Sequence, residues 1–340
     1  MSTHLETEPA AAAGGGVELT YREAIGAALA HELEADPTVL LMGEDVATAG
    51  GVFKTNEGLP EKLGLERIRN TPICENGFIG VALGMAVTGL RPVVEIMFSD
   101  FLPTAADAIV NELPKFRFMS GGQCVVPVTV RSVGGGTGRF GTQHSATGES
   151  WYMGLPGLKV ATAGTPASAY SVLRAAIRDD DPVLFFEHKG LYGRKGPVQL
   201  GEAGVAEIGK AAVLRPGADV TVLSTLLMAD RSATAADALA DEGIQAEVIE
   251  LRWLRPLDYD TIIESVTRTG RLLVVEEQVH TAGWGATVIS ELTMRGVPMG
   301  RPAALSMPDD LLVSYSPTLE DAIIPGVDAI AARIREVVQG

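Results

Sequence analysis

The second half of the chain alternates between two hydrophobic periods. Short segments rich in Val, Leu and Ile, typical of strands, occupy residues 220–223, 246–251 and 272–276. Apolar residues that recur every three or four positions predict helices at residues 226–242, 259–268, 283–295 and 327–338. Strands that alternate with helices usually form a mostly parallel sheet with helices on both faces. We therefore expect an α/β domain in this half.

The first half shows the same alternation. Thr20 and Glu23 form a capping box that opens a helix over residues 21–34. Pro114 is expected to break or kink a helical stretch at residues 103–119. A further helix is predicted at residues 166–178, and strands at residues 39–42, 93–97, 125–131, 158–163 and 183–187. The predicted fold class is α/β, with two domains and mostly parallel sheets.

Composition shifts divide the chain into segments. Residues 1–16 are small and acidic, and we expect them to form a disordered lead-in. Glycine and proline are frequent in residues 191–204, which form the candidate linker. The two predicted domains are then residues 17–190 and 205–340.

Composition and charge restrict the class of protein. The chain has 340 residues, 46% hydrophobic and 21% charged, which suits two globular domains with their own cores. Its net charge of −16 argues against a nucleic-acid partner. Apolar runs fall short of the ~18 residues of a membrane span, and two cysteines are too few for a disulfide framework. Residues 1–16 lack the features of a secretory or transit peptide, so a cytoplasmic location is predicted.

Candidate chemistry concentrates in residues 71–101. Glu75 opens a strongly apolar segment, residues 77–87, whose composition predicts a buried helix. A carboxyl group in apolar surroundings has a raised pKa unless a cation pairs with it, so Glu75 suits proton exchange with a nitrogen base. The alternative is that Glu75 only stabilises the helix N-terminus through the helix dipole.

Two further candidate residues lie in loops after predicted strands. Glu44 follows the strand at residues 39–42, and open α/β sheets bind ligands at the carboxyl ends of their strands. His144 follows a glycine-rich loop, residues 134–141, for which we consider a mobile loop that closes over a site. The alternatives are a solvated acid at Glu44 and a hydrogen-bonded loop histidine at His144.

A set of motifs resembles one family over nearly the whole chain, from about Thr20 to the C-terminus. The motifs are GEDV (43–46), PICENGF (72–78), GLRPVVEIMF (89–98), MSGG (119–122), TQHS (142–145), PGLKV (156–160) and AAIRDDDPV (175–183). In combination they resemble the beta subunit of the thiamin-diphosphate-dependent decarboxylase component of 2-oxoacid dehydrogenase complexes. Pyruvate, branched-chain 2-oxoacid and acetoin dehydrogenases share this transketolase-like subunit.

The resemblance implies thiamin diphosphate as cofactor and assigns roles to matched residues. Glu75 would be the carboxyl group that shares a proton with N1′ of the aminopyrimidine. Glu44 would be a second catalytic carboxylate, close to Glu75. Met97 and Phe101 would pack around the pyrimidine ring, with Ile73 nearby. The cofactor supplies the organic chemistry, and the protein supplies geometry and electrostatics.

The resemblance also implies partners. In the family pattern, the diphosphate is held through magnesium by a Gly-Asp-Gly stretch, which this sequence lacks. An alpha subunit should therefore supply the magnesium and diphosphate half of the site, in an α2β2 heterotetramer. The acyl group would pass to the lipoyl group of a dihydrolipoyl acyltransferase core. His144 would lie at the substrate end, where it positions the 2-oxoacid or the lipoyl group, or moves a proton.

A potassium site is implied at the turn after the helix at residues 166–178. By matched position its ligands would be Val128, Ala176, Asp179 and Asp181. Backbone carbonyls and a carboxylate suit a hard monovalent cation. The family often has Asn at the position of Asp181, so a plain acidic turn is the alternative.

The function predicted from the sequence is oxidative decarboxylation of a 2-oxoacid or cleavage of acetoin, with acyl transfer to lipoyl. The sequence leaves the substrate open. Two alternatives are weighed. One is a non-catalytic subunit that docks the acyltransferase core, against which Glu44, Glu75 and His144 together argue. The other is the C-terminal half of a split transketolase or deoxyxylulose-phosphate synthase, whose basic phosphate contacts are sparse here.

Overall fold

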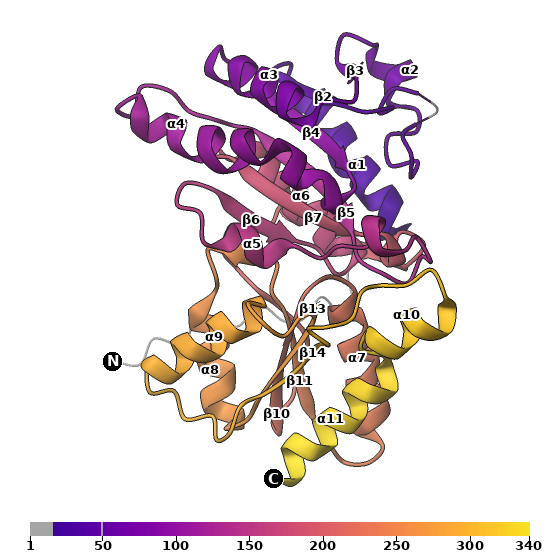
Figure 1. The fold of residues 1–340 in the computed structure, drawn as a ribbon, viewed down its shortest axis with the longest axis vertical. Coiled ribbons are helices and arrows are strands. Elements are labelled where there is room, and N and C mark those ends of the chain that lie inside the picture. The colour runs from indigo at the N-terminus through magenta and orange to yellow at the C-terminus, as the bar shows by residue number, and fades with distance from the viewer. Residues whose placement is uncertain (1–15, 49) are drawn as a thin grey trace.

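A computed structural model describes residues 16–48 and 50–340 of the chain. The predicted lead-in at residues 1–16 lies outside the described residues except for Gly16. In the described part, the strands form a seven-stranded sheet, a five-stranded sheet and a two-stranded ribbon. The N-terminal half, indigo to magenta in Figure 1, is stacked on the orange-to-yellow C-terminal half. The predicted α/β class with mostly parallel sheets is confirmed.

The seven-stranded sheet organises the N-terminal half. Its order is β12-β6-β7-β5-β4-β2-β3, and each neighbouring pair is parallel except β12 with β6. Since β2 to β7 run in one direction, the loops after them gather at one edge of the sheet. The strands are β2 (Val39–Gly43), β3 (Ile68–Asn70), β4 (Arg91–Met97), β5 (Thr129–Gly134), β6 (Lys159–Thr162), β7 (Val183–His188) and β12 (Trp253–Arg255).

Helices cover both faces of this sheet because its strands are apolar on both sides. Leu41 and Val93 face one core, which α1 and α6 complete, and Leu40 and Val94 face the other, which α3 completes. Successive strand residues point to opposite faces, so one apolar run contributes to both cores. The helices are α1 (Tyr21–Ala35), α2 (Leu59–Leu63), α3 (Glu75–Val87), α4 (Leu113–Met119), α5 (Glu149–Met153) and α6 (Pro166–Arg178).

The five-stranded sheet organises the C-terminal half in the order β14-β13-β10-β11-β9, parallel except for β11 with β9. Helices α7 and α11 pack on one face, and α8 and α9 on the other. No helix among the described residues has the length and hydrophobicity needed to span a bilayer. The elements are β9 (Ala212–Arg215), β10 (Val220–Ser224), α7 (Leu226–Ala240), β11 (Ala246–Glu250), α8 (Tyr259–Thr269), β13 (Leu272–Val279), α9 (Trp284–Met294), β14 (Ala303–Met307), α10 (Pro317–Ile323) and α11 (Val327–Gln339).

The segment between β4 and β5 differs from its prediction. The expected helix at 103–119 is a 3₁₀ helix (Ser99–Ala105), a π-helix (Asp107–Glu112) and then α4. Pro114 lies in the first turn of α4, where a missing N–H costs no helical hydrogen bond, so this proline begins a regular helix. The strand predicted at 125–131 starts later, at Thr129, because Val126 instead donates to the Asp180 carbonyl at 3.0 Å.

Two short strands also depart from the prediction. Within the candidate linker, β8 (Lys195–Val198) pairs antiparallel with β1 (Val17–Thr20). The linker therefore contains part of the two-stranded ribbon. Strand β12, from the second half of the sequence, adds to the edge of the N-terminal sheet. Each of these strands is only three or four residues long, which is too short for a hydrophobic period to reveal.

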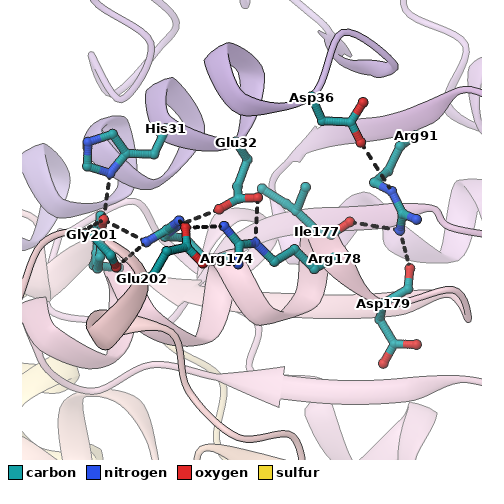
Figure 2. A network of polar contacts seen from close by, with 11 residues as sticks. His31, Glu32, Asp36, Arg91, Arg174, Ile177, Arg178, Asp179, Gly201 and Glu202 are labelled. Carbon is teal, nitrogen blue, oxygen red and sulfur yellow. Dashed lines mark hydrogen bonds and ion pairs between the residues drawn. The ribbon is translucent and has the colours of Figure 1, made fainter.

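An ion-pair network fastens the end of the linker to the helices of the N-terminal half (Figure 2). Arg174 on α6 is 2% exposed and lies 2.6 Å from Glu32 on α1. It also donates to the Gly201 carbonyl at 2.5 Å and pairs with Glu202 at 2.9 Å. Arg178, one turn later, contacts the same two carboxylates. Helices α1 and α6 and residues 201–202 thus form one block.

Helix α3 is buried on one face only in this chain. Phe78 and Ile79 are buried against the sheet, whereas Val81 is 50% exposed. Ile73, just before the helix, is 82% exposed. The prediction of a fully buried helix is therefore wrong for the single chain, because no described segment covers its outward apolar face. Contiguous exposed apolar surface of this kind usually marks an interaction site.

Candidate active site at the carboxyl edge of the seven-stranded sheet

The loops that carry the predicted catalytic residues meet at the carboxyl edge of the seven-stranded sheet. The order β5-β4-β2-β3 places the segments that follow these strands side by side. His144 comes after β5, Phe101 after β4, Glu44 after β2 and Glu75 after β3. The parallel topology therefore gathers residues that are far apart in the sequence.

Glu44 directly follows β2, and Glu75 opens α3 five residues after β3, the strand next to β2. β2 and β3 pair in parallel, and the Thr71 N–H donates to the Gly43 carbonyl at 2.8 Å. Burial raises the pKa of Glu44, and the nearby Glu75 carboxylate raises it further. A like charge nearby disfavours the ionised form of a carboxyl group, and here this acts on Glu44.

Unpartnered polar atoms lie beside these acids. Glu44 Oε1 and Thr71 Oγ1 are buried and have no hydrogen-bond partner among the described residues. Glu75 is half-buried in the first turn of α3, whose N-cap residue, Cys74, makes no capping hydrogen bond. Buried polar atoms normally have partners. These atoms, together with the exposed Ile73, fit a ligand that has both polar and apolar parts.

His144 lies between two phenylalanine rings. Its imidazole meets Phe98 and Phe101 nearly at right angles, with ring centroids 5.0 Å and 5.5 Å away. Met97 directly precedes Phe98 at the end of β4 and is 8% exposed. Phe101, a predicted cofactor-binding residue, thus contacts the predicted substrate-binding histidine.

The glycine-rich loop before His144 is attached to the C-terminal half. The Gly136 N–H donates to the Glu277 carboxylate on β13 at 2.6 Å. Arg139 pairs with Asp321 on α10 at 2.8 Å. His188, at the end of β7, contacts the same Glu277 carboxylate at 2.8 Å. These contacts hold the loop against the second half in the described structure, and they do not resemble those of a free lid.

Lys189 is a residue of this edge that sequence reasoning missed. It follows β7, is 9% exposed, and donates a hydrogen bond to the His144 carbonyl. Burial lowers the pKa of Lys189 to about 8, although Glu277 and Asp100 oppose this shift. The charged triplet at residues 187–189, at the end of an apolar strand, was the available signal.

The carboxylates of the predicted potassium site already have cationic partners. Lys159 Nζ lies 2.8 Å from Asp179 and 3.1 Å from Asp181. Arg91 donates to the main-chain carbonyls of Asp179 at 2.6 Å and of Ile177 at 3.1 Å (Figure 2). The turn after α6 therefore has its negative charge balanced by side chains of this chain.

The other two predicted potassium ligands make backbone hydrogen bonds. The Val128 carbonyl accepts from the Val183 N–H at 3.0 Å, and the Ala176 carbonyl accepts from the Asp179 N–H at 3.3 Å. Each carbonyl has a second lone pair, so these bonds alone leave room for a cation. The Lys159 ammonium, however, supplies the positive charge that a cation would bring. The potassium site stays a prediction that this geometry does not favour.

Two clefts in the described part of the chain lie away from the three predicted catalytic residues. A cleft of about 830 Å³ is lined by residues from α5, β12, α8 and α9. A second of about 450 Å³ lies beside α4. Neither is lined by Glu44, Glu75 or His144. The candidate site is therefore defined by its strand ends and unpartnered groups rather than by either of these two clefts.

Comparison with protein families defines the class of the chain. Residues 17–195 match the transketolase pyrimidine binding domain, and residues 209–330 match the transketolase C-terminal domain. Among solved structures, one described as "Split gene transketolase, inactive beta4 tetramer" superposes with a TM-score of 0.78 at 24% identity, covering 94% of this chain and 99% of that one. At this identity the superposition shows the shared fold. The chain is therefore built from two transketolase-type domains.

Comparison with characterised proteins defines the family. The chain is 42% identical to the pyruvate dehydrogenase E1 component subunit beta-2, mitochondrial, of Oryza sativa subsp. japonica, over 92% of this chain and 84% of that protein. It is 38% identical to the acetoin:2,6-dichlorophenolindophenol oxidoreductase subunit beta of Cupriavidus necator (95% and 98%). It is also 38% identical to the 2-oxoisovalerate dehydrogenase subunit beta of Bacillus subtilis (94% and 99%). The chain belongs to the family of beta subunits of the decarboxylase component of 2-oxoacid dehydrogenases.

Proposed function

We propose that this chain supplies the pyrimidine half of a thiamin-diphosphate site, which an alpha subunit completes. The assembled enzyme oxidatively decarboxylates a 2-oxoacid or cleaves acetoin, and it passes the acyl group to the lipoyl group of an acyltransferase core. The observation that carries this proposal is the pair of nearby carboxyl groups, Glu44 after β2 and Glu75 at the start of α3, with Glu44 Oε1 left unpartnered.

The residues at this edge fit the pyrimidine part of the cofactor. Thiamin diphosphate, when bound, supplies the electron sink that decarboxylation of a 2-oxoacid requires. Glu75 would hold and exchange a proton at N1′ of the aminopyrimidine, and Glu44 would support the protonation of Glu75. The apolar side chains of Ile73, Met97 and Phe101 would contact the ring and exclude water. The raised pKa of Glu44 and the exposed side chain of Ile73 support these assignments.

His144 would act at the substrate end of the same site. Its ring contacts Phe101, so a ligand that packs on Phe101 would lie near the imidazole. An imidazole can donate or accept a proton near neutral pH, which suits positioning of a 2-oxoacid or of the lipoyl group. We assign His144 to substrate engagement and acyl transfer rather than to cofactor binding.

The partners follow from the part of the site that this chain lacks. The sequence has no Gly-Asp-Gly stretch for magnesium and diphosphate, so these contacts are assigned to an alpha subunit in an α2β2 heterotetramer. The uncovered apolar face of α3, next to Glu75, supports a partner at this position. A cytoplasmic location is part of the same proposal, although the rice relative named above is described as mitochondrial.

The purified chain alone is expected to be inactive and to bind thiamin diphosphate with magnesium only weakly. The contacts to magnesium and the diphosphate would be absent without the alpha subunit. Isothermal titration calorimetry on the single chain should show no tight, magnesium-dependent binding, and the same titration on the assembled pair should show it. Micromolar binding by a homo-oligomer of this chain would contradict a shared site.

Steady-state rates of the assembled pair decide the substrate. Pyruvate, 2-oxoisovalerate and acetoin should be compared at matched concentrations, with a ketose phosphate as the assay for transketolase chemistry. Turnover of one of the first three supports the proposed function. Turnover of the ketose phosphate alone would replace it with the split-transketolase alternative.

His144→Ala is expected to lower acyl transfer to lipoyl by about 10²-fold, the lower range for loss of an acid–base group, while cofactor affinity stays nearly unchanged. The reason is that His144 contacts Phe101 from the loop side and lies in a different segment from Glu44 and Glu75. Gln143→Ala, in the same exposed 3₁₀ turn, is the matched control. A loss of cofactor affinity as large as the loss of turnover would show that His144 is misassigned.

A further inference from the structure

Lys189 is a nearly buried cation beside the candidate site. It begins the short 3₁₀ turn Lys189–Leu191 at the carboxyl end of β7, and only 9% of the residue is exposed. Among the described residues, no carboxylate lies within ion-pair distance of its ammonium, in contrast to Arg131 and Arg174. A buried charge is costly without compensating contacts. Contacts with neighbouring groups must therefore compensate for the burial of the Lys189 ammonium.

Aromatic faces and one carbonyl provide these contacts. Lys189 Nζ donates to the main-chain carbonyl of His144. It also lies 5.5 Å from the ring centroid of Phe98 and 5.2 Å from that of Phe140. Both distances are within the range of a cation–π interaction, which is worth more when the cation is desolvated. The ammonium thus has three contacts. Two are with the segment that carries His144, and the third is with Phe98 at the end of β4.

The glycine-rich loop leaves room for this side chain. A Cβ atom at Gly138 would lie 2.6 Å from the Phe140 ring and 3.3 Å from Lys189 Cε. The loop can therefore close on the lysine stem and the phenylalanine only where a side chain is absent. The glycine, Lys189 and Phe140 form one packed unit directly before the histidine.

The segment around His144 is held at several points. Lys189 binds the His144 carbonyl, and two residues later the Ala146 N–H donates to the Asp100 carboxylate, 3.2 Å from each oxygen. Phe98 contacts both the Lys189 ammonium and the His144 ring. The same phenylalanine thus links the cation to the imidazole, and the main chain and ring of His144 are held by one cluster.

We propose that Lys189 is a positioning residue for His144: its ammonium, held between Phe98 and Phe140, fixes the main chain of His144 and so sets the direction in which the imidazole points. This inference rests on the role of His144 in the proposed function. Lys189 acts through His144 and contacts no part of the cofactor site assigned to Glu44 and Glu75.

The electrostatic surroundings make this contact sensitive to pH. Burial lowers the pKa of Lys189 to about 8, against the fields of Glu277, Asp100 and Glu320. Two of these acids have closer partners, because Glu277 contacts His188 and Glu320 pairs with an arginine of the loop. Above about pH 8 the lysine loses its charge, and a charge-assisted hydrogen bond and two cation–π contacts weaken together.

The test uses the enzyme assembled with its alpha subunit and a free lipoyl domain as acceptor. Lys189→Met, which keeps the stem but removes charge and donor, is expected to lower acyl transfer about ten- to a hundredfold, the size of a charged hydrogen bond. Lys189→Arg keeps both and should retain most of the rate. Lys195→Met, at an exposed lysine of β8, is the matched control. Cofactor affinity should be unchanged in all three variants.

Two further measurements separate positioning from general stabilisation. In a His144→Ala background, Lys189→Met should have little additional effect, because the residues act as a unit. The wild-type rate of acyl transfer should fall above about pH 8, and Lys189→Arg should remove this alkaline limb, since arginine keeps its charge. Additive effects of the two substitutions, or an alkaline limb that persists in Lys189→Arg, would overturn the proposal.

Hydrogen exchange tests the role of Lys189 without depending on enzyme activity. Hydrogen exchange followed by mass spectrometry should show faster exchange at residues 142–146 in Lys189→Met, and wild-type exchange there in Lys189→Arg. Unchanged exchange in Lys189→Met would overturn the positioning role even in a fully active enzyme. If the assembled wild-type enzyme turns over no 2-oxoacid and no acetoin, the proposed function fails, whereas the exchange result still decides whether Lys189 holds the segment.

Discussion

Glu75→Gln, in the enzyme assembled with its alpha subunit, is expected to lower turnover by about 10²–10⁴-fold while the fold is unchanged. Glutamine keeps the size of glutamate and one hydrogen bond, but it cannot exchange a proton in the same way. Glu75 is half-buried in the first turn of α3 and its side chain makes no hydrogen bond or ion pair with another described residue, so its substitution should not unfold the chain. Far-ultraviolet circular dichroism and thermal unfolding check this second part.

The loss should appear in rate more than in binding. An interaction that strengthens as the reaction proceeds lowers the barrier without tightening the ground-state complex. We therefore expect little change in cofactor affinity for Glu75→Gln, but slower hydrogen–deuterium exchange at C2 of bound thiamin diphosphate. Nuclear magnetic resonance after acid quench measures that exchange directly, without the later steps of acyl transfer.

Two variants bracket this result. Glu44→Gln should show a smaller loss than Glu75→Gln, because Glu44 acts through the neighbouring carboxyl group. Glu61→Gln, at an exposed position of α2, should behave as wild type. A well-folded Glu75→Gln enzyme with near-normal C2 exchange would show that this carboxylate only stabilises the start of α3 through its dipole.

The fold could be predicted largely from local patterns. Strands such as β2 and β7 are continuous apolar runs, and helices such as α1 and α6 carry their own capping residues. These signals are local, so a single sequence contains them. Strand β12 has three residues and exists because it pairs with β6, a segment about 90 positions earlier in the chain. Pairing over such a distance leaves no periodic trace in the sequence.

The candidate site could be predicted where a motif fixed it and not where packing created it. Glu44, Glu75 and His144 follow strands or open a helix, and parallel topology then brings their loops to one edge. Lys189 carries no motif, and its importance appears only once its ammonium meets the His144 carbonyl. For α3 the prediction fails for a different reason. Its apolar composition predicts burial on all sides, but its outward face is exposed in this chain alone.

Arg131→Met is expected to lower the melting temperature by roughly 6–20 °C. The Arg131 side chain is 1% exposed and lies 2.8 Å from Glu95 and 2.7 Å from Glu187, across three adjacent strands. Breaking a buried ion pair by removing one partner costs about 3–5 kcal/mol, because the other charge is left uncompensated. One kcal/mol shifts the melting temperature by about 2–4 °C in a domain of this size. Differential scanning calorimetry of the assembled enzyme measures the shift.

The loss of stability caused by Arg131→Met should become smaller as the pH falls. Burial already raises the pKa of Glu95, and the Arg131 guanidinium opposes that shift. Without the guanidinium, the folded state holds a proton on the Glu95 carboxyl group more tightly than the unfolded state does. The folded variant then binds more protons, so its free energy of unfolding increases as pH falls. We expect the difference from wild type to be smaller at about pH 5.5 than at about pH 7.5.

A surface pair provides the control for Arg131→Met. Arg194 lies 2.7 Å from Asp230 with its side chain 53% exposed, and exposed pairs contribute about 0–1 kcal/mol. Arg194→Met should therefore shift the melting temperature by only a few degrees, with little change between the two pH values. If Arg131→Met behaved like this control, the buried ion pairs of Arg131 would contribute little to the stability of the fold. Glu95→Gln would then leave stability unchanged as well, whereas a compensated ion pair predicts a clear loss.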